Sequence, residues 1–585
     1  MINLLYNVNK FHDKICEVLN MLRKRLLSLA AAALLALSPA AGAAQYYSSA
    51  ITAYAQEEIL NADAADHSEL LDKCRGYYAY NDLGKQENGA NLQKFYNKLY
   101  EVYSDVWTSD TDYTLYPGQT DLYVVDQVRF TSYGLTKSEA ILCYYALRDD
   151  NPVMYYLINQ YSTGSYTFYA PINRQYTKAS VRKALQEEIS EYIEKMTAPL
   201  SGYTRRFEKA LILHDKLLPL MTYNYDAVTI GSKISNKETV TAAEQDMHVY
   251  SHNIIGAVKY QTGVCESYAK TYQMLLNYAG VDNVYVVGTD VKNSAGHAWN
   301  AVKMDNGTYY FVDATFDDHP ETHKYFAKGY TVFNENHIVR EANMSSYNYF
   351  YELPTIPTGD YSCQANSPSL KTVMDQFAFY INEDNTVTVT RYLGSAEKVN
   401  IPEKILDMKV TGIGSDCFFN KPKVSEVNIP EGVTSIGDGA FLIALTSSKT
   451  ITIPKSVTSI GDYAVGYRNS LGGSYNFDGN YSALAPTKIS GFTIKCYKNS
   501  AAYNYAVKNG ISYELLANTV TAGDADSNGK VNIADVIRIQ QYLAGWKVKV
   551  DLTASDVDAN GKVNIADVIR IQQHLAGWKV TLKTA

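Results

Sequence analysis

A cysteine at a predicted helix start, followed along the chain by a histidine and an aspartate, is the clearest chemical signal in this sequence. Cys265 lies in Gly-Val-Cys-Glu-Ser-Tyr-Ala, His297 in Gly-His-Ala-Trp-Asn and Asp313 in Val-Asp-Ala-Thr-Phe-Asp-Asp. Unpaired N–H groups at a helix start favour a negative charge, which is what a thiolate nucleophile needs. The three residue types predict a nucleophile, a base and a carboxylate that orients the base.

The helix that would carry the cysteine is predicted from apolar spacing. Ala269, Tyr272 and Leu276 recur on the face that also holds Cys265, so the sulfur should point inward. Gly280 follows where a C-terminal cap belongs. A short apolar strand is expected at Val284–Gly288, and with two further strands it predicts a small antiparallel sheet against this helix.

The histidine and the aspartate are predicted to lie on two strands of a hairpin. Residues 305–307 form a three-residue loop with Gly307 at the position that needs φ > 0. In the resulting register Asp313 faces Trp299, and His297 is the diagonal neighbour of Asp313 on the same sheet face. A two-residue loop would place the two side chains on opposite faces.

These three blocks, in this order, resemble the signature of the transglutaminase-like superfamily. The stretch Ser251–Val258, and Tyr325-Phe326 followed by His337, resemble its bacterial branch, so that the resemblance covers roughly residues 205–350. It implies an α+β transglutaminase/papain-like core and a triad that acts on protein amide bonds through a thioester, without a catalytic cofactor. Bacterial relatives include hydrolases and acyltransferases. Where many of them carry a tyrosine this chain has Ile255, so the side chain that assists the oxyanion is not identified.

Other interpretations of the same residues stay open. A lone buried cysteine is usually a small core residue, and an intact triad can be catalytically silent. We expect His214 to be structural, and His252 is a candidate for supporting Cys265 because it lies close to it in sequence.

The N-terminus has the pattern of a secretory signal. Arg23-Lys24-Arg25 precedes the apolar run Leu26–Leu37, and small residues follow up to Ala44. We expect residues 1–44 to be removed, with translation starting at Met21, and a secreted protein without a membrane span. From 45 to 200 the chain is predicted to be mostly helical, with helices over Thr136–Asp149 and Ala179–Met196.

Composition narrows the class of protein. A length of 585 residues suggests three to five domains, and the net charge of −8 without a long basic run argues against nucleic-acid binding. Seven cysteines occur, of which Cys16 lies in the predicted signal. No C-x-x-C pair is present, so no zinc site is indicated, and the disulfide state stays open.

A repeat occupies the second half of the chain. Val399-Asn400-Ile401-Pro402 recurs at Val427–Pro430 and Ile451–Pro454, at intervals of 24 to 28 residues, which predicts a solenoid. The units resemble the leucine-rich repeats of bacterial surface proteins. Cys417 stands at the small buried position of its repeat. A recognition surface for a glycan or protein ligand and a plain spacer are equally compatible with this segment.

Two acidic loops near the C-terminus have the spacing of calcium sites, with glycine at position 6. The predicted ligands are Asp524, Asp526, Asn528, Lys530 (backbone), Asn532 and Asp535, and then Asp556, Asp558, Asn560, Lys562 (backbone), Asn564 and Asp567. Because an aspartate stands at position 12 and a single helix follows each loop, the pair resembles a type I dockerin. The resemblance implies two Ca²⁺ ions and a scaffoldin cohesin as partner, with Ile533, Ala534, Ile565 and Ala566 choosing that partner.

Together these features predict a multidomain chain. It has a helical N-terminal region, an α+β transglutaminase/papain-like core, a leucine-rich-repeat solenoid and a small all-α calcium-binding dockerin. The expected segments are 1–44 (signal), 45–200 (helical region), 201–351 (core), 352–372 (linker), 373–516 (repeats), 517–521 (linker) and 522–582 (dockerin).

The expected function is that of a cellulosome-associated peptidase or amidase. Transfer to a lysine, a silent adhesin and an accessory role in polysaccharide degradation are the alternatives. No convincing carboxylate pair for glycoside hydrolysis is found in the sequence.

Overall fold

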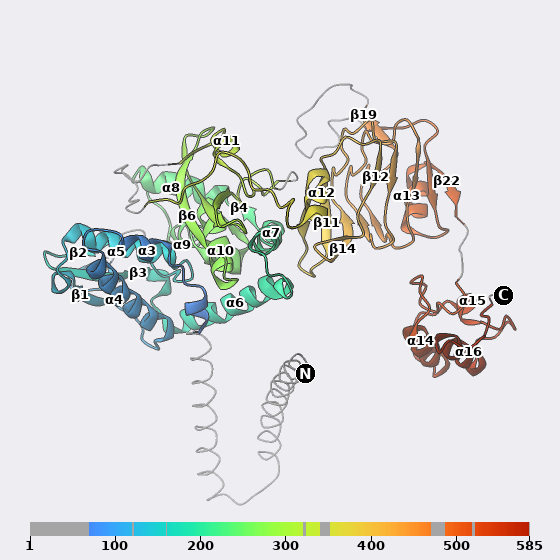
Figure 1. Cartoon of the computed structure of the whole chain (residues 1–585), viewed down its shortest axis with the longest axis horizontal. Helices are drawn as coiled ribbons and strands as arrows, with labels where there is room; N and C mark the ends of the chain where they lie inside the picture. Colours follow the sequence, from blue (N-terminus) through green and yellow to red (C-terminus); the bar gives the residue numbers. More distant parts are fainter. Residues whose placement is uncertain are drawn as a thin grey trace, which may run out of the picture. The chain divides into compact units, whose positions relative to one another are not determined.

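The computed structural model describes residues 69–119, 122–158, 161–319, 323–339, 352–469, 486–516 and 521–583 (Figure 1). The chain divides into two compact units. The described part of the first runs to Arg75 and includes Asn88–Leu147 and Tyr156–Ser190, and the second includes Gly76–Glu87, Arg148–Tyr155 and the chain from Glu191 onward. The predicted signal, residues 1–44, lies outside the described residues.

The first unit is helical and also contains a small sheet. Buried aromatic side chains such as Phe95, Tyr103 and Phe168 form its core. The predicted helices are confirmed, but the sheet was not predicted, because its strands show no clear alternation of apolar and polar residues. The elements are α4 (Gly89–Thr108), α5 (Lys137–Asp150), α6 (Ala179–Thr197), β1 (Tyr123–Arg129), β2 (Ser162–Thr163) and β3 (Thr167–Ile172), with strand order β1-β3-β2.

Within the second unit, a four-stranded antiparallel sheet packs on one long helix in the part of the chain that carries Cys265, His297 and Asp313. The helix α10 (Cys265–Tyr278) packs against β6 and β7, and α7 (Arg206–Leu217) packs against α10 (Figure 1). The strands are β6 (Asn283–Asp290), β7 (Ala295–Lys303), β8 (Tyr309–Val312) and β9 (His337–Val339), in the order β8-β7-β6-β9.

The β7–β8 hairpin has the predicted register. Asn300 pairs with Val312, so one further residue along the same register places Asp313 opposite Trp299. Gly307 has φ of +79° in the connecting loop, where a side chain would be strained. The predicted loop length is therefore what brings His297 and Asp313 to one face.

The segment expected to be a linker, residues 352–372, packs on the core for part of its length. The Asp360 carboxylate accepts the backbone N–H of Gly329 at 3.0 Å and lies 3.1 Å from Lys328 Nζ. The backbone N–H of Tyr361 donates to the Ala327 carbonyl at 3.0 Å. A helix, α12 (Pro368–Gln376), then begins before the expected end of the linker. The proline and glycine content of this segment had indicated a linker. Its hydrogen bonds to the backbone of Ala327 and Gly329 nevertheless attach it to the core.

The repeat segment stacks short parallel strands. Val399 pairs with Val427 across β12 (Lys398–Asn400) and β15 (Glu426–Asn428), as the spacing of the repeat predicts. Cys417 is buried, as expected. A second row of strands consists of β10 (Phe377–Ile381), β11 (Val387–Tyr392), β14 (Met408–Ile413), β16 (Ser435–Ile436) and β18 (Ser459–Ile460). The far end holds β17 (Thr450–Thr452), β21 (Thr493–Cys496), α13 (Ala501–Asn509) and β22 (Ser512–Leu515).

The C-terminal module consists of two loop–helix repeats, with α14 (Ile533–Leu543), α16 (Ile565–Leu575) and the short α15 (Leu552–Ser555). Val536, Ile539, Val568 and Ile571 meet in its core. Among the described residues, no helix is both long and apolar enough to cross a membrane. The six cysteines of the described segments are free thiols.

Candidate functional site

Cys265 is the first residue of α10, and its side chain is half-buried. It packs against Ala269, Tyr285 and Ala298, so the sulfur faces the sheet as predicted. Gly263, two residues earlier, lies so close to α10 that an added Cβ would be 2.4 Å from the Ser267 Cβ. This glycine therefore permits the close approach that brings the cysteine to the helix start.

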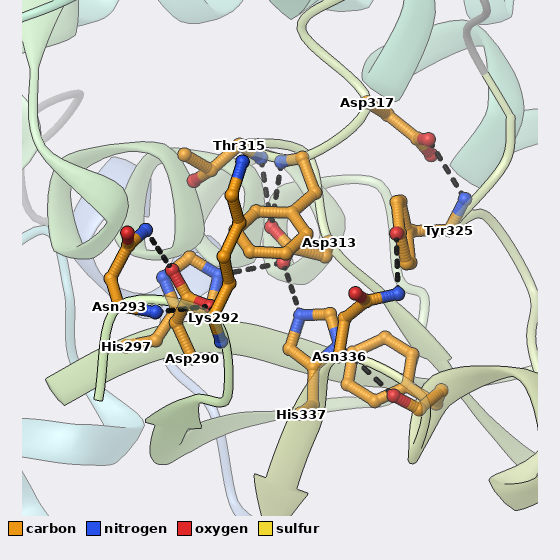
Figure 2. Close-up of polar contacts among 12 residues, drawn as sticks. Asp290, Lys292, Asn293, His297, Asp313, Thr315, Asp317, Tyr325, Asn336 and His337 are labelled. Carbon is orange, nitrogen blue, oxygen red and sulfur yellow. Dashed lines mark hydrogen bonds and ion pairs between the residues drawn. The ribbon is translucent and has the colours of Figure 1, made fainter. Parts of the chain in front are cut away.

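His297 and Asp313 are in direct contact. His297 Nε2 lies 2.7 Å from Asp313 Oδ2, and Figure 2 shows this pair on one face of the sheet. Because a carboxylate only accepts, Nε2 is the donor. The other ring nitrogen, Nδ1, is the one that does not bind Asp313, and Cys265 lies close enough to raise the pKa of the same imidazole. The three residues predicted from the sequence thus come together from α10, β7 and the end of β8.

The Asp313 carboxylate is fully buried and accepts on both oxygens. Oδ1 receives the backbone N–H groups of Thr315 at 2.9 Å and Phe316 at 3.1 Å. Oδ2 receives His297 and, at 2.8 Å, Nε2 of His337 (Figure 2). These contacts fix the plane of the carboxylate, so it can hold one orientation of the His297 ring.

The charges in this site act on one another. Burial acts to lower the pKa of His297, but the charge and hydrogen bond of Asp313, followed by the hydrogen bond and charge of Cys265, raise it well above its usual value. Burial acts to raise the pKa of Asp313, yet the charge of His297 and hydrogen bonds from His297 and His337 hold it far below its usual range. The site therefore favours an ionised carboxylate beside an imidazolium.

His337 is the residue whose role the sequence did not reveal. It begins β9, pairs with Asp290 of β6, and is fully buried. Its ring stacks on Phe333 with centroids 3.9 Å apart, and its Nδ1 lies 3.1 Å from the Phe333 carbonyl oxygen. Sequence spacing carries no signal for this placement, because β9 reaches the site through a non-local strand pairing.

Three further side chains, Tyr223, Ile255 and His252, bear on whether Cys265 and an oxyanion have additional support. The half-buried Tyr223 has its pKa raised by burial and then by the charge of Cys265. Tyr223 lies on β4 (Thr222–Tyr223), directly opposite Gly263. Ile255 is buried and apolar, so it offers no hydrogen bond to an oxyanion. His252 Nδ1 lies 2.6 Å from the His248 carbonyl oxygen, and the charge of His252 helps to lower the pKa of Glu266.

A second buried group of histidines and aspartates joins α7 to the loop after β8. His214 Nδ1 lies 2.8 Å from Asp215 Oδ1, and His214 Nε2 lies 3.3 Å from Asp317 Oδ2. His323 Nε2 lies 2.8 Å from Asp215 Oδ1. Asp317 also accepts the backbone N–H of Tyr325 at 2.8 Å. This group holds the loop that carries Asp313, in keeping with the structural role expected for His214.

The two acidic loops fit calcium. Asp524, Asp526 and Asp535 offer oxygens within 4.8 Å of one another, and the equivalent aspartates of the second loop, Asp556, Asp558 and Asp567, do the same. Burial raises the pKa of Asp524, and the nearby charge of Asp535 adds to this. Such clustered carboxylates need a cation.

The predicted asparagine at position 9 of each loop has another contact. Asn532 and Asn564 cap α14 and α16, where each side chain accepts the N–H two residues on at 2.8 Å. Asn528 and Asn560 accept the N–H groups of Lys530 and Lys562 at 2.9 Å.

The residues predicted to choose the partner lie at the surface. Ile533 is 60% exposed and Ile565 is 59% exposed, and Ala534 and Ala566 beside them are also exposed. Trp546 and Trp578, which follow the ends of α14 and α16 by three residues, were not predicted as contact residues, and they are 62% and 64% exposed. Both helices therefore present the same apolar groups.

Family models match three parts of the chain. Residues 203–344 match a transglutaminase-like domain, 392–494 match a BspA type leucine rich repeat region in six copies, and 522–576 match a dockerin type I domain. The chain is accordingly multidomain, with a helical N-terminal region, a transglutaminase-like core, a leucine-rich-repeat region and a C-terminal dockerin. The dockerin implies docking of the cellulosome type, and type I dockerins generally bind calcium.

Solved structures resemble parts of the chain. A cysteine protease-like protein from Cytophaga hutchinsonii is 14% identical over 22% of this chain and 37% of its own, with a TM-score of 0.16. A TGase is 16% identical over 27% and 43%, with a TM-score of 0.19. A leucine rich repeat protein of T. pallidum is 21% identical over 15% and 52%, with a TM-score of 0.14. Each match thus spans little more than half of the solved chain or less. No curated protein matches this sequence.

Proposed function

We propose that this protein is a secreted cysteine enzyme that acts on protein amide bonds and docks through calcium to a cohesin of a cellulosome-type complex. The contact of 2.7 Å between His297 Nε2 and Asp313 Oδ2, with Cys265 close enough to raise the pKa of the same imidazole, is the observation that carries the proposal. Nucleophile, base and orienting carboxylate are the parts that thiol-dependent acyl transfer needs.

The first half of the reaction forms a thioester. The Cys265 thiolate attacks the amide carbonyl carbon, and the carbonyl oxygen takes up the negative charge. His297 gives its Nδ1 proton to the amide nitrogen, so that the C–N bond breaks and the amine leaves. Backbone N–H groups at the start of α10 lie beside the developing oxyanion, and Tyr223 is a neutral hydroxyl suited to assist there.

The second half returns the free enzyme. His297, now neutral, takes a proton from water while the water oxygen attacks the thioester carbon. The C–S bond then breaks, the thiolate re-forms and the acid product leaves. A lysine amine in place of water would give an isopeptide product instead. We favour hydrolysis because water is always at hand, which makes the protein a peptidase or amidase.

Docking is a separate activity of the C-terminal module. Two calcium ions bound by the two acidic loops would hold α14 and α16 in place, and the exposed Ile533–Ala534 and Ile565–Ala566 pairs would meet the cohesin. The repeats would supply a further surface for a glycan or protein ligand.

One experiment compares the chain from Gln45 onward with its Cys265→Ala variant. Each is incubated in calcium with unfolded and cell-wall proteins and a labelled primary amine, and the products are identified by mass spectrometry. Fragments that depend on Cys265 would support a peptidase, and label on glutamine would support transamidation. If neither forms while the chain still binds cohesin, the catalytic proposal fails. A binding component that uses its repeats, or an accessory protein of polysaccharide degradation, then takes its place.

A further inference from the structure

We propose that His337 is a positioning residue of this site, and that it acts as a doubly protonated cation which shares Asp313 with the catalytic histidine. The inference rests on the proposed function only in so far as Cys265 and His297 form the reactive pair. His337 is then a fourth member of that arrangement, and its charge sets the pH range over which His297 keeps its proton.

The two ring nitrogens of His337 both face acceptors. Nε2 lies 2.8 Å from Asp313 Oδ2, and Nδ1 lies 3.1 Å from the Phe333 carbonyl oxygen. Neither oxygen can donate a hydrogen bond as long as Asp313 is ionised. A neutral imidazole carries one proton and would leave one of these buried contacts without hydrogen, so both are satisfied only by an imidazolium.

The surroundings of His337 are compatible with a positive charge. The titratable groups in contact with it are Asp313, His297 of β7 and Tyr325. Asp290 is its register partner in β6, and the Asp290 carboxylate accepts N–H groups of Lys292 and Asn293. The rest of the contact surface is aromatic, with Phe333 stacked on one side and Phe316 and Trp299 within 4.7 and 5.1 Å between ring centroids. This packing leaves the ring one orientation.

Charge balance gives His337 its effect on the reaction. In the resting pair the thiolate of Cys265 and the imidazolium of His297 cancel, so the ionised Asp313 would be left as an uncompensated buried charge. A cationic His337 neutralises it. At the same time, His337 competes for the carboxylate oxygen that stabilises the His297 imidazolium, and its charge repels that imidazolium from a centroid distance of 5.5 Å. His337 thereby makes His297 readier to give its proton to the leaving amine.

The test uses alkylation of Cys265 by iodoacetamide, which needs no protein substrate. The rate at Cys265 is followed from pH 4 to 11 by peptide-resolved mass spectrometry on the chain from Gln45, since the other described cysteines are buried. His337→Gln keeps a hydrogen-bond donor but removes the charge. We expect the upper limb of its profile, which reports loss of the His297 proton, to move upward by about one to two pH units. His574→Gln, a change of the same type in the dockerin module, serves as control and should leave the profile unchanged.

An unchanged upper limb in a folded His337→Gln variant, with the same melting temperature, would overturn the proposal. If the variant does not fold, ¹⁵N-histidine labelling of the unaltered chain decides instead. Two protonated nitrogens on the ring that contacts Phe333 support a cationic His337, and one protonated nitrogen refutes it. If the chain cleaves no substrate but His337→Gln still shifts the upper limb of the alkylation profile, the proposed function is refuted and the role of His337 is supported.

Discussion

Gly288 of β6 lies directly opposite His297 of β7, at a point where the chain has no room for a side chain. A Cβ atom added at Gly288 would lie 2.3 Å from the Ile338 carbonyl oxygen and 2.3 Å from the Trp299 ring. The Ile338 oxygen belongs to the backbone of β9, and the Trp299 ring is buried. The glycine therefore lets β9, with His337, approach the strand that carries His297.

Gly288→Ala should move β9 away from the site. We expect a loss of about 1–3 kcal/mol in the free energy of unfolding, because neither neighbour can yield without moving the sheet or its core. The upper limb of the Cys265 alkylation profile should move upward as well, because His337 is displaced together with β9. Thermal denaturation and the alkylation profile measure the two effects. Gly359→Ala is the control, since nothing lies within 4 Å of a Cβ there. Equal stability of both variants would contradict this view of Gly288.

Asp313→Asn should lower kcat by about 10³- to 10⁴-fold and change KM little. The amide cannot accept from both histidines and stabilise the imidazolium, so His297 loses its orientation and tautomer. Steady-state kinetics on whichever substrate the product survey identifies would measure this. Asp318→Asn is the control. The Asp318 carboxylate lies on the same loop and accepts a hydrogen bond from the Tyr268 hydroxyl at 2.6 Å. This variant should retain activity within about tenfold; a similar loss in both variants would point to loop damage instead.

The buried His214 should make stability depend on pH. Burial acts to lower the pKa of His214, but the hydrogen bond to Asp215 and the charges of Asp215 and Asp317 raise it from 6.5 to about 9. Because the folded pKa lies above the unfolded one, the stabilisation is fully present below about pH 6.5 and is lost as the pH rises through 9. Its size should be up to about 3 kcal/mol.

Chemical denaturation of the chain and its His214→Gln variant at several pH values measures this term. The stability difference between the two should shrink between pH 6.5 and 9, because only the unaltered chain loses a buried cation there. A difference that stays constant across this window would show that His214 is neutral in the folded protein.

Calcium should be required for folding of the C-terminal module. Asp535→Ala and Asp567→Ala should each lower the number of bound ions from two to one in calorimetry, because each removes a ligand at position 12. Lys530→Ala is the matched control and should keep both ions, since that position contributes its backbone carbonyl. A chelator should abolish cohesin binding of the unaltered chain. Retention of binding in chelator would refute this coupling.

The two halves of the dockerin should bind cohesin in two orientations related by about 180°. Residues 530–548 and 562–580 are identical except for Tyr542 against His574, and both expose the same apolar groups. Trp546→Ala or Trp578→Ala alone should weaken binding only a few-fold, whereas the double variant should lose about 100-fold or more. His574→Tyr, which makes the halves identical, should change nothing. A large loss from one single variant would indicate one orientation only.

Much of the candidate site could be predicted because its signals are local. A three-residue loop with Gly307 fixed the parity of the hairpin, and parity decides the face on which a side chain lies. The start of α10 followed from the apolar spacing after Cys265. The calcium loops needed only the spacing of oxygens within twelve residues. Each of these inferences uses residues that are neighbours along the chain.

Contacts between residues that are far apart along the chain could not be predicted from the sequence. Spacing along the chain did not indicate that His337 would share Asp313 with His297, because that depends on β9 pairing with β6 across the sheet. The partnership of His214 with Asp317, and the packing of the expected linker through Asp360, are non-local in the same way. The sequence by itself determined which residue types could form a triad, and on which face of the hairpin His297 and Asp313 stand. The tertiary structure decided which buried charges meet, because a buried charge must find its partner wherever the fold brings one.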